Sequence, residues 1–157
     1  MKITLLTVGK TNELSFKNAI SEYQKRLKFY IPFDIAEIPE LKNCKNIPEE
    51  VQKQKEGELI LKNLTDSDEV ILLDDKGEAY TSLQFATYLE KKMITGNKRL
   101  IFVVGGPYGF SKEIYLRANG KLSLSPMTFS HQMVRLVFTE QLYRAMTILR
   151  GEGYHHE

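Results

Sequence analysis

The sequence predicts an α/β protein in which a parallel sheet is sandwiched between helices. The first observation is that strand-like and helix-like segments alternate along the 157 residues. The second is that several strand-like segments, residues 99–104 above all, are apolar throughout, as in strands covered on both faces. The third is that the helix-like segments carry apolar residues three and four positions apart. Since there is no internal repeat or linker, we expect one domain spanning residues 1–157.

The N-terminal half is expected to hold two strands and two helices. Residues 2–8 read as a buried strand, because the apolar run ends at Val8-Gly9-Lys10 with no signal-peptide cleavage site. Residues 15–29 form an amphipathic helix whose apolar positions are Phe16, Ala19, Ile20, Tyr23 and Leu27. After Pro32, residues 33–38 read as an edge strand, and Pro48 opens a charged helix over residues 49–64.

The C-terminal half continues the alternation. Residues 69–73 form a short buried strand that ends in the turn sequence Asp74-Asp75-Lys76-Gly77. Ser82 is expected to cap the next helix, whose apolar stripe is Phe85, Ala86, Leu89 and Met93. There follow a strand over 99–104, a short helix over 111–118 capped by Ser111, a strand over 121–124, and a final helix over 130–150 that is stopped by Gly151 and Gly153.

The composition is that of a soluble globular protein, with 42% hydrophobic and 27% charged residues. No apolar run approaches the ~20 residues that span a bilayer, so we expect a cytoplasmic protein with no membrane partner. The net charge of +2 permits a nucleic-acid partner without arguing for one. The lone Cys44 excludes an internal disulfide and a multi-cysteine zinc site, and with only three histidines we expect no metal.

Three loops stand out as a candidate ligand site. In parallel sheets ligands bind outside the carboxyl ends of the strands, which selects the loops after Leu73, Val104 and Leu124. The second loop is the glycine turn Gly105-Gly106-Pro107-Tyr108-Gly109, which lets a ligand approach bare backbone groups. Such groups can hold an adenine ring between apolar walls; the alternative is a mere tight turn. The spacing matches neither a dinucleotide-binding loop nor a P-loop.

The final helix carries many polar side chains for a helix that is otherwise apolar. His131 and Arg135 lie four residues apart and face the same side, with Gln132 beside them. Glu140, Tyr143 and Arg144 repeat the arrangement two turns later. The alternative is a solvated face with ion pairs such as Glu140 to Arg144, and spacing alone does not decide between them.

Taken together, these motifs resemble the RlmH family, the ribosomal large-subunit methyltransferase H proteins of the SPOUT class. The resemblance runs from Met1 to the Tyr-His tail. The segments that carry it are Leu72-Leu73-Asp74 with Gly77, Val104-Gly105-Gly106-Pro107-Tyr108-Gly109, Leu124-Ser125-Pro126-Met127-Thr128-Phe129, His131-Gln132-Met133-Val134-Arg135, Glu140-Gln141-Leu142-Tyr143-Arg144-Ala145, Gly151 and Tyr154-His155. Two positions depart from the family pattern, with Ser130 and Gly153 where the family usually has proline.

The resemblance implies a C-terminal trefoil knot, a homodimer and S-adenosylmethionine as the methyl donor. It implies methylation of N3 of a pseudouridine in the helix 69 loop of 23S rRNA, on the assembled 70S ribosome. Carried over by position, the cofactor contacts are Leu73, Gly105, Leu124, Ser125, Pro126, Met127, Thr128 and Phe129.

The catalytic candidates are Tyr154, His155, Arg135 and His131. We expect Tyr154 or His155 near the target base, since aromatic side chains stack on unstacked RNA bases; the alternative is a frayed terminus. Arg135, like Arg144, suits rRNA phosphate better than proton transfer, because arginine stays charged. His131 is either the base that removes the N3 proton or a histidine that packs in the dimer interface.

Three other functions stay open at this point. One is a related SPOUT enzyme that acts on tRNA. Another is a ribosome-binding factor that has lost the chemistry. The third is a flavin- or nucleotide-binding oxidoreductase of flavodoxin-like shape, which the absence of a phosphate-binding loop disfavours.

Overall fold

The computed structural model describes residues 1–42 and 44–157. In chain order the elements are β1 (Lys2–Val8), α1 (Leu14–Leu27), β2 (Phe33–Ile38), the 3₁₀ turn η1 (Cys44–Asn46), α2 (Glu49–Lys62), β3 (Glu69–Ala79), α3 (Ser82–Ile94), β4 (Arg99–Val104), α4 (Lys112–Arg117), β5 (Gly120–Ser123) and α5 (Met133–Leu149). Asn43 and the side chain of Cys44 lie outside the described part of the chain, so the expectation for that cysteine stays a prediction.

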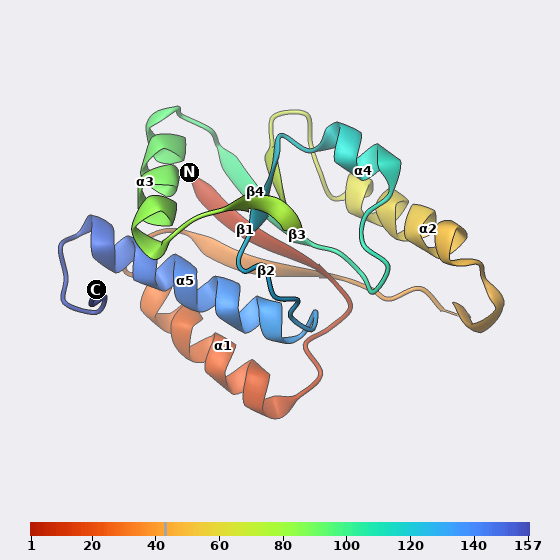
Figure 1. Ribbon diagram of the computed structural model, residues 1–157, viewed down its shortest axis with the longest axis horizontal. Helices are drawn as coiled ribbons and strands as arrows, with labels where there is room; N and C mark the ends of the chain where they lie inside the picture. Colours follow the sequence, from red (N-terminus) through yellow and green to blue (C-terminus); the bar gives the residue numbers. More distant parts are fainter. Residues whose placement is uncertain (43) are drawn as a thin grey trace.

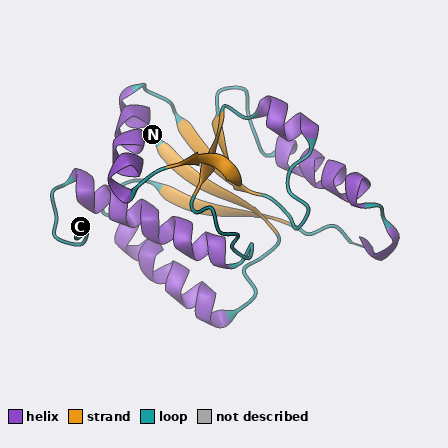
Figure 2. Ribbon diagram, in the orientation of Figure 1, coloured by secondary structure: helices purple, strands orange, loops and turns teal. Residues whose placement is uncertain are grey.

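The five strands form one sheet in the order β2-β1-β4-β3-β5, and every pair of neighbours is parallel. The predicted parallel α/β architecture is therefore confirmed, as is the edge position of β2. Helices α1, α3 and α5 cover one face of the sheet, and α2 and α4 cover the other (Figures 1 and 2). All strand carboxyl ends consequently point to the same edge of the sheet.

Two apolar cores lie on the two faces of the sheet. On the face covered by α1, α3 and α5, Phe102 of the central strand packs against Phe85 of α3 and Phe138 of α5. On the opposite face, Ile101 and Val103 pack with Ile60 of α2 and Ile114 of α4. Alternate residues of β4 therefore point into different cores, which explains why this segment is apolar throughout.

Strand β3 is longer than predicted. The predicted turn, Asp74 to Gly77, is a bulge inside the strand, since Leu73 and Glu78 both align with Leu122 of β5. The turn chemistry is nevertheless present, because Asp74 Oδ1 accepts the Lys76 amide at 2.9 Å. A side chain at Gly77 would meet the β5 backbone, with its Cβ 2.7 Å from the Leu122 nitrogen, so the bulge requires glycine there.

Helices α1 and α2 each end two residues earlier than predicted, at Leu27 and Lys62, and α3 and α5 begin differently from the prediction. The cap of α3 is Thr81 rather than Ser82: the Thr81 hydroxyl accepts the Gln84 amide, and the Gln84 side chain accepts the Thr81 amide, a capping box. Helix α5 begins at Met133 rather than Ser130, although the Ser130 hydroxyl accepts the Met133 amide. Gly151, at φ +68°, ends this helix as predicted. Nowhere in the described residues is a helix long and apolar enough to cross a membrane.

Candidate functional site

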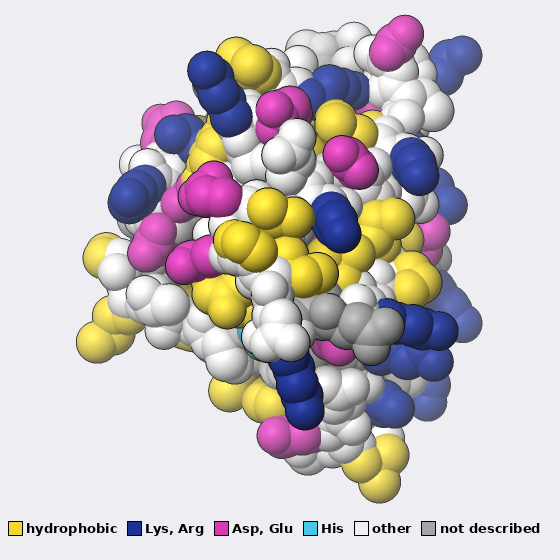
Figure 3. All heavy atoms as spheres, turned by 90° about the vertical axis from the view of Figure 1, so that its right-hand side faces the viewer, with side chains coloured by type: hydrophobic (Ala, Val, Ile, Leu, Met, Phe, Trp, Pro, Cys, Tyr) yellow, Lys and Arg dark blue, Asp and Glu magenta, His cyan; other side chains and the backbone are white. Residues whose placement is uncertain are grey.

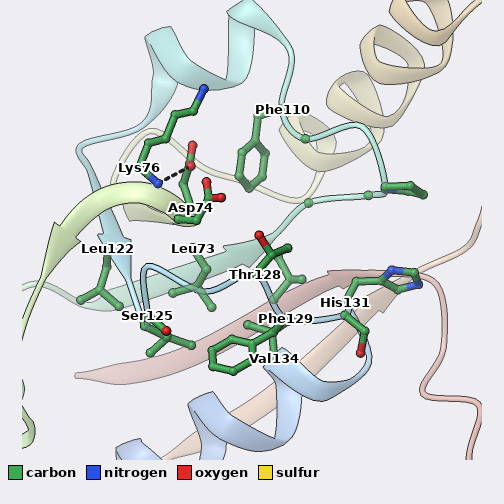
Figure 4. Close-up of a pocket in the computed structure, with 18 of the residues that line it drawn as sticks. Leu73, Asp74, Lys76, Phe110, Leu122, Ser125, Thr128, Phe129, His131 and Val134 are labelled. Atoms are coloured by element: carbon green, nitrogen blue, oxygen red, sulfur yellow. Dashed lines mark hydrogen bonds between the residues drawn. The ribbon is translucent and has the colours of Figure 1, made fainter.

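The three loops singled out in the sequence converge on one cavity of about 580 Å³ at the carboxyl ends of β3, β4 and β5. Its apolar surface comes from Leu73 and Leu122, which lie beside each other on neighbouring strands, and from Phe129 and Val134 below them (Figure 4). In the same view Phe110 lies on the opposite side of the cavity from Phe129, and Thr128 lies between them. The cavity is thus walled by side chains on rigid strands and covered by backbone-rich loops.

Most of the predicted contact residues line this cavity. They are Leu73, Gly105, Leu124, Ser125, Met127, Thr128, Phe129 and His131. Pro126 is not among the lining residues, nor are Arg135, Tyr154 and His155. His131 lies at the edge of the cavity, with its ring directed away from Leu73 and Leu122 (Figure 4).

The loop that follows β5 is held by its own serines. The Ser123 hydroxyl donates to the Ser125 carbonyl at 2.9 Å, and the Ser125 hydroxyl accepts the Met127 amide at 2.9 Å. These short-range bonds give the loop a defined shape on the cavity side. Met127 is 78% exposed at its tip, so the loop presents both polar backbone and an apolar side chain to a ligand or partner.

Asp74 and Tyr115 form a contact at the wall of the cavity that was not predicted from the sequence. Tyr115 of α4 donates its hydroxyl to Asp74 Oδ2 at 2.7 Å. Burial opposes ionisation of Asp74, but hydrogen bonds from the Lys76 amide and from Tyr115 hold the pKa of its carboxyl below the ordinary value. Burial and the bond to Asp74 raise the pKa of Tyr115 to about 12. At neutral pH this wall is therefore a carboxylate paired with a neutral phenol. Local spacing offered no signal for a contact between residues 41 positions apart.

The glycine turn fits closely against its surroundings. A Cβ on Gly105 would lie 3.1 Å from the Phe110 ring, and a Cβ on Gly106 would lie 2.2 Å from Glu56 Oε2. The loop backbone is therefore pressed against α2 on its outer side, and its inner side is left free to line the cavity. Gly109, at φ +83°, completes the turn with its amide donating to the Gly106 carbonyl.

Replacing Gly106 by alanine is expected to lower the free energy of unfolding by about 1–3 kcal/mol, the usual range for overpacking a filled site. The physical reason is that the new methyl group would overlap the Glu56 carboxylate, which is itself buried and would have to shift. Chemical denaturation measures the effect. Gly153→Ala is the matched control, because a Cβ there meets nothing within 4 Å. Equal stability of the two variants would contradict the close contact at Gly106.

Arg135 has a different role from the one predicted, because its side chain is fully buried. Its guanidinium donates to the carbonyls of Val8, Gly9 and His131 and to the Thr11 hydroxyl, at 3.0–3.2 Å. Binding of rRNA phosphate needs an exposed guanidinium, so that prediction does not agree with the structure. Arg135 instead ties the start of α5 to the end of β1.

The C-terminal tail is packed rather than frayed, but it lies at the other end of α5 from the cavity (Figure 1). Tyr154 donates to Glu140 Oε1 at 3.0 Å and packs edge-on against Tyr143. Burial, followed by hydrogen bonds with Tyr23 and Glu140, raises the pKa of Tyr154, so its phenol stays neutral. The ion pair between Glu140 and Arg144, which the sequence offered as the alternative to a functional face, is present, with Nη2 to Oε1 at 2.6 Å.

His155 is oriented by Arg144, whose Nη1 lies 3.1 Å from the imidazole Nδ1. Because arginine only donates, Nδ1 accepts, and the ring proton of a neutral His155 sits on Nε2. That Nε2 is buried and has no hydrogen-bond partner among the described residues. The nearest carboxylate to this atom is that of Glu157, with Oε1 at 3.8 Å. The tail therefore holds an N–H donor without a hydrogen bond among the described residues, next to the Tyr154 phenol.

The comparisons with known proteins identify the family of the chain. The profile of the family described as "Predicted SPOUT methyltransferase" matches residues 1–155. Proteins named "Ribosomal RNA large subunit methyltransferase H" are 62% identical in Parabacteroides distasonis, 58% in Bacteroides thetaiotaomicron and 57% in Flavobacterium johnsoniae, each over the full length of both chains. The resemblance noted in the sequence is thereby confirmed, and the chain belongs to the SPOUT methyltransferase family.

Proposed function

We propose that this protein transfers a methyl group from S-adenosylmethionine to N3 of a pseudouridine in the helix 69 loop of 23S rRNA, on the assembled 70S ribosome in the cytoplasm. The observation that carries the proposal is the cavity itself, which gathers seven of the eight residues expected to contact the cofactor. The names of the full-length relatives support the class of substrate, since they are ribosomal RNA methyltransferases.

The chemistry of the cavity fits S-adenosylmethionine, which has a positively charged sulfonium and no phosphate. Among the described residues, the lining includes the carboxylates of Asp74 and Asp75, one lysine, Lys76, and no arginine, so the acidic groups outnumber the basic one. An ionised Asp74 favours a cationic ligand and disfavours the phosphates of a dinucleotide or a flavin nucleotide. The volume of about 580 Å³ is in the usual range for a small-molecule cofactor site.

The residues would divide the task as follows. Leu73, Leu124 and Phe129 would enclose the adenine, and backbone groups of Gly105 and of the loop after β5 would pair with its polar edge. When bound, the cofactor supplies a methyl carbon that is electrophilic without a metal. What remains for the protein is to align the base and to take the proton from its N3, which together are typically worth several kcal/mol.

His131 is the candidate that lies at the cavity and can accept that proton. His155 would donate from Nε2 to a base or phosphate oxygen, because Arg144 already occupies its Nδ1 lone pair. In the free chain this Nε2 is buried, 3.8 Å from the Glu157 carboxylate, so binding of the RNA would have to uncover it. Tyr154, a neutral phenol, is suited to stacking on the base. We therefore assign proton removal to His131, and alignment of the base to Tyr154 and His155.

This division of labour requires a second copy of the chain, since the tail lies far from the cavity of its own subunit. In the proposed homodimer the tail of one subunit completes the cavity of the other. The exposed apolar side chains Met127 and Met133, at the loop after β5 and the start of α5, suit such an interface. The family relationship also supports the proposed trefoil knot in the C-terminal part of the single domain, a rare topology that local patterns do not reveal.

An RNA partner is also supported by the surface. Figure 3 shows Lys and Arg side chains gathered along the right-hand border of one face, beside a central area of hydrophobic side chains. Basic groups of this kind attract RNA phosphates and position the protein without reading sequence.

Calorimetry with the purified protein tests the cofactor. We expect saturable binding of S-adenosylmethionine and of its demethylated product, and none of ATP or FMN. Binding of FMN instead would favour the flavodoxin-like alternative. Tight binding of S-adenosylmethionine without methyl transfer to any RNA would favour the non-catalytic ribosome-binding factor.

A further inference from the structure

Glu56 is a buried acidic residue outside the cavity, and neither the proposed cofactor contacts nor the proposed chemistry uses it. It lies on α2, its side chain is only 5% exposed, and its Oε1 has no hydrogen-bond partner among the described residues. Burying a carboxylate without full pairing destabilises a folded protein. Such a group calls for a functional explanation.

The Glu56 side chain lies directly against the glycine turn. Both carboxylate oxygens lie against Gly106, since a Cβ built there would be 2.2 Å from Oε2 and 2.8 Å from Oε1. The next residue, Gly57, packs just as closely on the Ser111 hydroxyl at the start of α4. Helix α2 thus presses on both ends of the segment 105–111, directly behind the wall of the cavity.

No cation is among the groups that shift the pKa of Glu56 in the described part of the chain. Burial raises the pKa of Glu56 and the charge of Glu40, which follows β2, raises it further, whereas a hydrogen bond with Gln52 lowers it. The turn facing it consists of Gly105, Gly106, Pro107, Tyr108 and Gly109, which offers no charged side chain. The turn does have backbone amide N–H groups, and these can donate hydrogen bonds to a carboxylate that lies against glycine backbone.

We propose that Glu56 is a positioning residue, whose carboxylate sets the conformation of the Gly105–Gly109 turn and accepts amide N–H groups of that turn when the cofactor binds. The inference rests on the proposed function, because it takes the cavity to be the cofactor site. Glu56 acts through the turn and does not itself touch the cofactor. The free Oε1 is the acceptor that the ligand-bound turn uses.

The test compares Glu56→Gln with wild type by calorimetry with S-adenosylmethionine. The amide has the same shape but lacks the charge, so we expect the dissociation constant to rise about 10- to 100-fold, the equivalent of one charge-assisted hydrogen bond. The melting temperature is expected to stay the same or to rise, because the substitution removes an uncompensated buried charge. Glu58→Gln, at an exposed position of the same helix, is the matched control and leaves both quantities unchanged.

A second readout does not depend on the ligand. Hydrogen exchange of the segment 105–109 in the free protein is expected to be faster in Glu56→Gln than in wild type or Glu58→Gln. Wild-type affinity for the cofactor in Glu56→Gln would overturn the inference, and so would a melting temperature that falls together with affinity, since that indicates a merely structural role. If wild type binds no S-adenosylmethionine, the proposed function fails. The exchange measurement then decides on Glu56, and unchanged exchange overturns its role.

Discussion

Replacing Arg135 by methionine is expected to lower the free energy of unfolding by about 3–5 kcal/mol, because several buried acceptors would each lose a partner at about 1–3 kcal/mol. Methionine fills much of the volume but donates no hydrogen bond. The carbonyls of Val8 and Gly9 and the hydroxyl of Thr11 would then lose their buried donor. Chemical denaturation measures the change, and it is expected to be the largest effect of any single polar substitution in α5.

Two further variants make this result specific. Arg135→Lys keeps the charge but not the planar fork, so we expect it to recover only part of the stability. Arg150→Met is the control on an exposed arginine that donates one bond to the Phe29 carbonyl, and it is expected to cost about 1 kcal/mol or less. If Arg135→Met lowered the free energy of unfolding by less than about 1 kcal/mol, the hydrogen bonds of Arg135 would not be what holds α5 to β1.

Replacing His155 by alanine is expected to lower the turnover of methyl transfer by about 10²-fold, the cost of a misaligned base, while the dissociation constant of S-adenosylmethionine stays unchanged. The reason is geometric: His155 lies outside the cavity of its own chain, yet carries an Nε2–H donor that Arg144 orients and that has no hydrogen bond among the described residues. Single-turnover kinetics and calorimetry measure the two quantities. The neighbouring exposed residue supplies the control, as His156→Ala is expected to behave like wild type.

If the two subunits share the site as proposed, a second experiment can test the role of His155. Mixed dimers of His155→Ala with a cavity variant that does not bind the cofactor would contain one site with both an intact cavity and an intact tail. We expect such mixtures to regain part of the activity that each variant has lost. Loss of cofactor affinity in His155→Ala, or no recovery in the mixed dimer, would contradict the assignment.

Much of the fold could be predicted because the core periodicity is local. The strand over residues 99–104 could be read directly, since side chains that point alternately into two cores must all be apolar. The extension of β3 was missed for the opposite reason. Asp74 to Gly77 has the composition of a turn, and only the pairing of Glu78 with Leu122 returns the chain to the same neighbour. Thr81 and Ser82 are both good caps, so composition could not choose between them.

The sequence predicted which loops form the site, but it did not predict which of the charged residues are buried. That the loops after Leu73, Val104 and Leu124 meet follows from a rule about strand ends and needed no contact information. The burial of Arg135 could not be read from its spacing to His131, because its partners lie in a segment more than 120 residues away. The same holds for Glu56, which the sequence placed only in a charged helix and whose contact with Gly106 joins residues 50 positions apart.

Methyl transfer from labelled S-adenosylmethionine to ribosomes that lack the modification tests the central claim most directly, with mapping of the label in the rRNA. Free large subunits and tRNA serve as parallel substrates. The account predicts one labelled position, a pseudouridine in helix 69, in assembled 70S particles only. Label in tRNA, or at another site of the ribosome, would contradict the proposed substrate even though the cofactor site stands.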